Sequence, residues 1–103
     1  MRVISKKTLV NFFNKHAASK VSLEAWYGEI VAQSFKKPED IIKSYKNADV
    51  ITGKRFVFNI KGNHYRLIAD IEFKLQIVFI VWIGTHAEYD KINVEEVSYV
   101  KNN

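Results

Sequence analysis

A group of basic and polar side chains in the second half of the sequence has the chemical types needed to cleave RNA. Attack of a 2′-hydroxyl on the neighbouring phosphate requires a base, an acid for the leaving 5′ oxygen, and cations beside the phosphate. Arginine and lysine provide cations, histidine acts as base or acid near neutrality, and tyrosine acts as acid or stacking surface. The group consists of Arg55, Asn59, Lys61, His64, Arg66, His86 and Tyr89.

The sequence holds no pattern typical of a metal or cofactor site. It has no cysteine, its histidines are not spaced as ligands with carboxylates, and its Asp and Glu residues are scattered. It also has no glycine-rich phosphate-binding loop and no nucleophile elbow. We therefore expect neither a metal nor a cofactor.

Most of these side chains are expected to lie together because the sequence after Lys54 predicts a β-hairpin. Large apolar residues alternate with others from Arg55 to Ile60, Gly62 and Asn63 suit a loop with positive φ, and the alternation then resumes. One face, here called the platform, would carry the pairs Lys61–His64, Asn59–Arg66, Val57–Ile68 and Arg55–Asp70. The other face would carry Ile60, Tyr65, Phe58, Leu67, Phe56 and Ala69. One face is thus apolar core, and the platform is polar and mostly cationic.

Each basic candidate also has a purely structural explanation. Arg55 and Lys61 suit a sheet edge, where charges discourage aggregation, and His64 borders a turn. Arg66 lies in the middle of an apolar strand, where an unpaired charge is costly unless its face is open to a partner or Asp70 compensates it. The pattern alone supports a ribonuclease and a non-catalytic nucleic-acid or ribosome binder about equally.

Three helices are predicted before the hairpin. The first follows an N-cap at Ser5, the second follows an N-cap at Ser22, and Pro38 suits the first turn of a short third helix. His16 falls on the apolar stripe of the first helix, so we interpret it as a packed residue. The apolar residues at helical spacing in the second helix are Leu23, Trp26, Tyr27, Ile30, Val31 and Phe35.

The strands follow the helices in the chain. The main strands are predicted at about 54–60, 64–73 and 76–83, with short strands at residues 2–4 and 50–51 as further candidates. This order indicates an α+β fold in which N-terminal helices pack on one face of an antiparallel sheet of three to four strands.

The last strand is apolar on both faces, so it should be central or covered on both sides. The turn before it carries no strong signal, and two registers remain open. We favour the register that places Val81 opposite Arg66 on the platform and sends Val78, Ile80 and Trp82 to the core, because it buries the large Trp82 beneath the helices.

A short helical turn is expected after the last strand, since Thr85 and Glu88 match a capping box. This turn would deliver His86 and Tyr89 to the edge of the platform, although His86 could also serve only to cap it. Residues 94–103 are predicted to be a loosely held tail.

The composition is typical of one small folded domain spanning residues 1–103, with 48% hydrophobic and 14% aromatic residues. Lysine and arginine (16) exceed aspartate and glutamate (11), and the pI is about 9.5. This balance favours a polyanionic partner, although solubility alone would also explain it. The N-terminus has no targeting pattern and the longest apolar run, residues 77–84, is too short to span a bilayer. We therefore expect a soluble, cytoplasmic protein with no membrane partner.

Two motifs resemble those of the HigB-type toxins in the RelE/ParE superfamily, the toxins of type II toxin–antitoxin systems. They are FNIKGNHYRLI and IGTHAEYDKI, and the opening MRVIS and the AWY of the second helix are also similar. The resemblance extends from Met1 to about Ile92. It implies a RelE-like fold with a short C-terminal helical turn, and an mRNA interferase that cuts mRNA on the translating ribosome without a metal or cofactor. It also implies a cognate HigA-like antitoxin with a helix-turn-helix as partner.

The resemblance also implies roles for individual residues. Lys61 and Arg66 would bind the scissile phosphate, and His86 and Tyr89 would supply proton transfer and base stacking. The positions that match the family motifs are Asn59, Lys61, Asn63, Tyr65, Arg66, His86, Glu88, Tyr89 and Asp90. Further RNA contacts are expected from Lys54, Arg55, Asn59, Asn63 and His64.

One departure from the family pattern concerns the last strand. An arginine often precedes the aromatic residue there, where this chain has Val81 and Trp82. The missing cation implies reduced activity, or reliance on Arg55 or Lys54.

Three functions are therefore compared: a ribosome-dependent mRNA endoribonuclease, a non-catalytic ParE-like inhibitor of the ribosome or gyrase, and a basic RNA-binding module. A helix-turn-helix or acidic antitoxin gene beside this one would separate the two toxins from the third. Codon preference, toxin–antitoxin stoichiometry and the role of His64 do not follow from the sequence.

Overall fold

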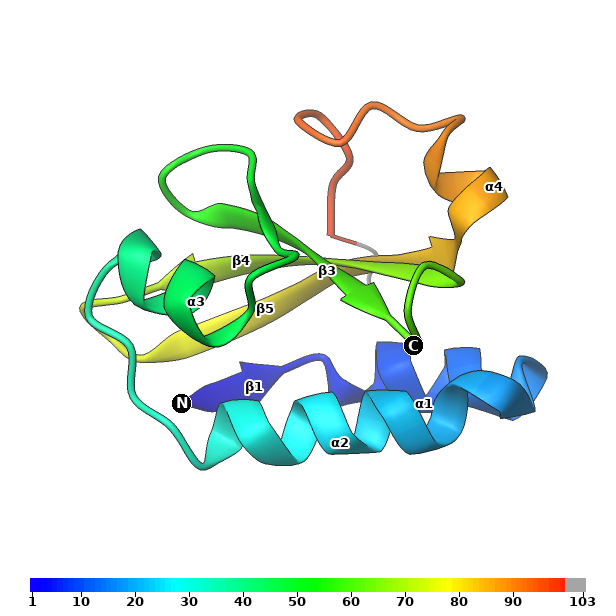
Figure 1. Cartoon of the computed structure of the whole chain (residues 1–103), viewed down its shortest axis with the longest axis horizontal. Helices are drawn as coiled ribbons and strands as arrows, with labels where there is room; N and C mark the ends of the chain where they lie inside the picture. Colours follow the sequence, from blue (N-terminus) through cyan, green and yellow to red (C-terminus); the bar gives the residue numbers. More distant parts are fainter. Residues whose placement is uncertain (100–103) are drawn as a thin grey trace.

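The computed structural model describes residues 1–99 and shows helices packed against a mostly antiparallel sheet (Figure 1). The sheet consists of β1 (Arg2–Ile4), β5 (Ile77–Thr85), β4 (Tyr65–Glu72), β3 (Arg55–Ile60) and β2 (Asp49–Val50), in that spatial order. The helices are α1 (Lys6–Lys15), a 3₁₀ turn η1 (Ala17–Ser19), α2 (Lys20–Val31), α3 (Pro38–Ser44) and α4 (His86–Tyr89). The predicted α+β fold is confirmed. No helix within residues 1–99 is long and apolar enough to cross a membrane.

The sheet has five strands rather than three or four because both short candidate strands, β1 and β2, pair with it. β1 pairs with β5 in the parallel sense, whereas the pairs β2–β3, β3–β4 and β4–β5 are antiparallel. Figure 1 shows α1 and α2 side by side beneath the sheet, and α4 with the C-terminal segment on the other side.

The main core lies between the sheet and the N-terminal helices. Every second residue of β3 and β4 points into it, since side chains alternate along a strand. The fully buried members with large side chains include Leu9, Leu23, Ile30, Ile41, Phe56, Phe58, Leu67, Ile71, Val78 and Ile80. Burial of this apolar set is the main force that fixes which face of the hairpin remains for function.

The starts of the first two helices differ from the sequence prediction. Ser5 does precede α1, but its φ is 73° and its side chain makes no capping hydrogen bond. Ser22 lies inside α2, because η1 continues directly into that helix with Ser19 at the N-cap position. Pro38 occupies the first turn of α3, as predicted.

The hairpin of β3 and β4 has the predicted register, with Asn59 opposite Arg66 and Val57 opposite Ile68. Its turn conformation differs in one respect. Gly62 has a positive φ of 61°, but the second residue with positive φ is Lys61, at 52°, and not Asn63. The left-handed conformation costs conformational energy at Lys61, which has a Cβ, whereas Gly62 adopts it without this cost.

The favoured register of the last strand is wrong. Val78 and Ile80 do enter the main core, but a bulge opposite Ile68 and Ala69 shifts the rest of β5 by one residue. Arg66 consequently faces Gly84, and Trp82 lies opposite Ile68 on the platform side. A bulge of this kind inserts one extra residue, which reverses the faces of all residues beyond it.

A second, smaller apolar cluster covers the middle of the platform. It consists of Val57, Ile68 and Val81, with Trp82, Tyr89, Ile51, Ile92, Val94 and Val97 packed against it. The platform is therefore divided: its middle is closed by the C-terminal segment, and its end near the β3–β4 turn lies outside that cover.

The C-terminal segment was expected to be loosely held. In the structure the Arg55 guanidinium donates to the main-chain oxygens of Val94, Glu95 and Val97, at 3.1, 3.2 and 2.7 Å. The Ser5 hydroxyl also donates to the Tyr99 hydroxyl. Residues 94–99 are thus attached to the sheet and to the start of α1, while residues 100–103 of that prediction lie outside the described residues.

Candidate functional site

The end of the platform near the β3–β4 turn carries Arg66. The side chain points to this face because its neighbours along β4, Tyr65 and Leu67, pack toward the helices. Directly across the strand pair lies Gly84, which has no side chain. Arg66 is half-buried. The place that a side chain on Gly84 would occupy is filled by the ring of Trp82.

The guanidinium of Arg66 is held by neutral groups only. It donates to the main-chain oxygen of Asn63 at 3.1 Å and to that of Tyr65 at 3.5 Å. Its central carbon lies 5.8 Å from the centre of the Tyr89 ring, a cation–π distance. Among residues 1–99, no carboxylate forms an ion pair with it. Its positive charge is therefore not neutralised within the described chain.

Tyr89 is positioned by the capping box at the start of α4, which the structure confirms. The Thr85 hydroxyl accepts from the main-chain N–H of Glu88 at 3.2 Å, and the Glu88 carboxylate accepts from the main-chain N–H of Thr85 at 2.8 Å. The second of these hydrogen bonds lowers the pKa of Glu88. α4 therefore begins at a fixed point at the end of β5.

The phenol of Tyr89 is partly removed from water. Burial raises its pKa above the ordinary value, and the charges of Asp49 and Asp90 act in the same direction, while Arg66 opposes them. The hydroxyl therefore stays protonated near neutral pH and can donate a hydrogen bond.

The hairpin turn and α4 are joined through the main chain. The N–H of His86 donates to the main-chain oxygen of His64 at 3.0 Å. The His64 ring is itself hydrogen-bonded to the main-chain oxygen of Lys61 at 2.8 Å. The imidazole of His86 lies 3.6 Å from the carboxylate of Asp90, and half of its side chain is exposed. Lys61 is exposed at the turn, so the two histidines, Lys61 and α4 share one end of the sheet.

Trp82 is a member of this region that the sequence did not identify. Its ring lies 6.2 Å from that of Tyr89 and covers Gly84 so closely that a Cβ on this glycine would overlap it. Only the bulge places Trp82 on this side, and the sequence contains no local signal for the bulge. The glycine followed by a capping box was the one available hint that the end of β5 has a special packing requirement.

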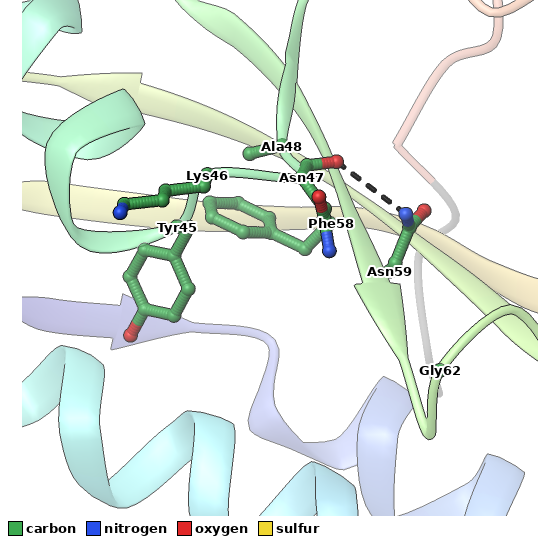
Figure 2. A pocket seen from close by; sticks show the side chains of 7 residues that line it. All are labelled: Tyr45, Lys46, Asn47, Ala48, Phe58, Asn59 and Gly62. Atoms are coloured by element: carbon green, nitrogen blue, oxygen red, sulfur yellow. Dashed lines mark hydrogen bonds between the residues drawn. The ribbon is translucent and has the colours of Figure 1, made fainter.

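Asn59 and Asn63 lie on either side of the turn. The amide of Asn59 donates to the main-chain oxygen of Asn47 at 3.4 Å, and Asn59 lines a pocket that includes Gly62 (Figure 2). Asn63 is exposed, and its carbonyl oxygen accepts from Arg66.

Two predicted RNA contacts lie elsewhere. Lys54 precedes β3 and Arg55 is its first residue, so about 20 Å of extended strand separates Arg55 from Lys61. Arg55 forms a bidentate ion pair with Asp70, at 2.7 and 2.8 Å. The structure therefore brings Asn59, Lys61, Asn63, His64, Arg66, His86 and Tyr89 to one end of the sheet and places Lys54 and Arg55 at the other.

His16 packs as expected, with its ring stacked on Phe12 at 4.3 Å and in edge contact with Tyr65 at 6.2 Å. Within residues 1–99, no three His, Asp or Glu side chains are close enough together to hold a metal ion.

The chain is similar to known proteins over most of its length. A family model described as HigB toxin, the RelE-like toxic component of a toxin–antitoxin system, matches residues 19–92. The mRNA interferase toxin HigB of Escherichia coli strain K12 is 34% identical over 92 residues, which cover 87% of this chain and 88% of the relative. The mRNA interferase HigB of Escherichia coli O6:H1 strain CFT073 is 32% identical over 94 residues, 89% of this chain and 91% of the relative.

The match covers β3, β4, β5 and α4, and thus every residue gathered at the hairpin end of the sheet. The chain therefore belongs to the HigB family of RelE-like toxins of toxin–antitoxin systems.

Proposed function

We propose that this toxin is a ribosome-dependent mRNA endoribonuclease that cleaves by attack of the RNA 2′-hydroxyl on the adjacent phosphate. Its relatives from Escherichia coli carry the name mRNA interferase and align over nearly the whole chain. The proposal adds the mechanism and the ribosome as the setting of the reaction.

The observation that carries the proposal is the state of Arg66. A half-buried guanidinium with no carboxylate partner within residues 1–99 is costly unless another anion binds it. The two hydrogen bonds to main-chain oxygens use one of its terminal nitrogens. The remaining N–H groups suit the paired oxygens of a phosphate.

The roles of the other groups follow from their chemistry. Lys61 and Arg66 hold the scissile phosphate and neutralise the charge that builds on it. His86 takes the proton of the 2′-hydroxyl as its oxygen bonds to phosphorus, and Tyr89 protonates the 5′ oxygen as the phosphorus–oxygen bond breaks. The products are a 2′,3′-cyclic phosphate and a 5′-hydroxyl, and no metal takes part in these steps.

The cationic role rests on Lys61 and Arg66 rather than on Lys54 or Arg55. Arg55 is engaged by Asp70 and by the C-terminal segment, and it lies at the far end of β3. Val81, where the family resemblance leads us to expect an arginine, is only 1% exposed and belongs to the second apolar cluster. A cation at that position would have to displace this packing.

A non-catalytic inhibitor of the ribosome or gyrase is the second candidate. The buried Val81 supports it, because the platform has one cation fewer at that position than a nuclease of this kind often uses. An inhibitor would use the same exposed basic end as a docking surface.

We also propose where the antitoxin binds. Membership of this family implies a cognate antitoxin. Its acidic or helical segments would cover the Lys61–Arg66 end of the sheet or displace α4, because this end carries the half-buried Arg66, which has no carboxylate partner within residues 1–99. Hydrogen exchange on the co-expressed pair should protect residues 61–66 and 86–90. Protection confined to α1 and α2 would contradict the proposal.

The nuclease proposal is tested on translating ribosomes by mapping mRNA ends after the toxin is added. We expect new 5′-hydroxyl ends with wild type, and none with Arg66→Ala or His86→Ala when circular dichroism shows both variants folded. An intact message under arrested translation would favour the inhibitor instead.

A further inference from the structure

A pocket opens at the free edge of β3, beside the hairpin turn (Figure 2). It is lined by Phe58 and Asn59 of β3, by Gly62 of the turn, and by Tyr45 and Asn47 of the segment that follows α3. Asn59 is the cross-strand neighbour of Arg66. The pocket therefore borders the residue that pairs with Arg66 across the two strands.

The pocket exists because β2 is short. β2 pairs with β3 only through Asp49 and Val50, opposite Val57 and Phe56. The last three residues of β3 therefore have no strand neighbour on this side within the described chain. Polar main-chain groups and the Asn59 side chain are consequently left at an edge that a ligand can approach.

One wall of the pocket is formed by the ring of Tyr45, which is well fixed. The rings of Tyr45 and Phe58 lie 5.2 Å apart at 84°, in edge contact, and Phe58 is 1% exposed. The Tyr45 hydroxyl donates to the Glu29 carboxylate at 3.2 Å, which holds the ring in place. Phe58 is buried and supports the Tyr45 ring, so the half-buried ring of Tyr45 is the aromatic surface that a planar apolar partner can reach.

The polar groups of the pocket are two carboxamides. Asn59 donates its amide to the main-chain oxygen of Asn47, so the amide oxygen of Asn59 is left as an acceptor. The side chain of Asn47 is exposed and has no hydrogen-bond partner among residues 1–99, so it can offer both a donor and an acceptor. Lys46 adds a positive charge at the rim.

We propose that this pocket holds the base of the nucleotide next to the scissile phosphate, and this inference rests on the proposed nuclease function. An aromatic wall with adjacent hydrogen-bonding amides is the arrangement by which proteins read single-stranded RNA bases. The amides of Asn47 and Asn59 read the hydrogen-bonding edge of the base, and Lys46 contacts the next phosphate. The pocket thus contributes to the choice of cleavage site.

The first test is binding without the ribosome. The side-chain amide signals of Asn47 and Asn59 are followed by NMR as each of the four nucleoside 5′-monophosphates is added to the toxin. We expect both amides to shift, and most strongly with one base. Asn47→Ala keeps the main-chain oxygen that Asn59 uses, and it should weaken the preferred nucleotide by about tenfold, the value of a lost pair of base hydrogen bonds. The exposed Asn14→Ala on α1 is the matched control and should not change binding.

The second test is the distribution of cuts in mRNA on translating ribosomes. Asn47→Ala should reduce the base preference at one position beside the cut, while Asn14→Ala keeps the wild-type distribution. If the wild type and Asn47→Ala cut the same sites and no nucleotide shifts the amides, the base pocket is refuted while the nuclease stands. If nucleotides shift the amides in a base-dependent way but no mRNA is cut, the pocket is supported as a nucleotide site and the nuclease is refuted.

Discussion

Arg55 is predicted to be a structural residue that fastens the C-terminal segment to the sheet, and Arg55→Ala tests this role. The guanidinium makes a bidentate pair with Asp70 and three hydrogen bonds to main-chain oxygens of residues 94–97. The exposed fractions of the two side chains are only 12% and 20%. Arg55→Ala therefore removes the ion pair and, at the same time, the attachment of the segment that covers the second apolar cluster.

The cost of the substitution can be worked from these contacts. Removing one partner of a fully buried ion pair costs about 3–5 kcal/mol, because the other charge is left unpaired. Partial exposure of Asp70 lets water reach the carboxylate, which reduces the loss to about 2–3 kcal/mol. In a domain of this size such a loss lowers the melting temperature by about 10–20 °C.

The assay is urea unfolding followed by circular dichroism, with mRNA cleavage measured on the same preparations. Arg55→Ala should lower the free energy of unfolding by about 2–3 kcal/mol, and Arg55→Lys should lose part of this. The neighbouring exposed Lys54→Ala is the matched control, with an expected change within about 0.5 kcal/mol. A cleavage defect in Arg55→Ala at unchanged stability would refute the reasoning and return Arg55 to the RNA contacts.

Three further predictions concern the end of β5 and α4. Gly84→Ala should cost about 1–3 kcal/mol and displace the Trp82 ring, seen as a shift in tryptophan fluorescence; an unchanged spectrum would contradict the packing. Thr85→Ala should cost about 1 kcal/mol of stability by removing the cap, and should slow cleavage by loosening α4. Hydrogen exchange of the α4 amides should become faster in this variant, and an unchanged exchange rate would contradict the role of the cap. The pKa of Glu88 is lowered in the folded protein, so its contribution to stability is present above the unfolded pKa and is lost as the pH falls through the folded pKa. NMR should therefore show α4 fraying on acidification, and this pH effect should be absent in Glu88→Gln.

The hairpin and the capping box could be predicted from the sequence because both depend on local patterns. Alternation fixed the register of β3 and β4, since a shift by one residue would have exposed the apolar face. The capping box of Thr85 and Glu88 involves residues three apart and needs no tertiary information. These two features place Arg66, His86 and Tyr89 near one another, and they are why the site could be outlined before the structure.

The last strand could not be predicted because β5 is apolar on both faces. Either register would bury a similar set of side chains, so the pattern does not choose between them. The turn before it places Gln76 at a φ of 56°, a conformation that glutamine does not signal. The bulge carries Trp82 to the platform, where its ring lies beside Tyr89 and covers Gly84, and no local pattern in the sequence marks it.

The attachment of residues 94–99 was likewise invisible in the sequence. Val94 and Val97 are two apolar residues in a polar stretch, too few for a periodic signal. Their packing depends on Arg55, whose donors reach main-chain oxygens that any residue would offer. Pairing of a charge with main-chain oxygens leaves no trace in side-chain patterns, so the sequence alone does not reveal this role of Arg55.

The most direct test of the central claim is the single-turnover rate of mRNA cleavage on programmed ribosomes, at saturating toxin, for wild type and Arg66→Ala. If Arg66 is the open guanidinium that stabilises the charge on the phosphate, the variant should be at least about 100-fold slower while its unfolding curve changes little. A variant that is folded and cleaves within about threefold of wild type would contradict the assignment of this end of the sheet as the site of cleavage.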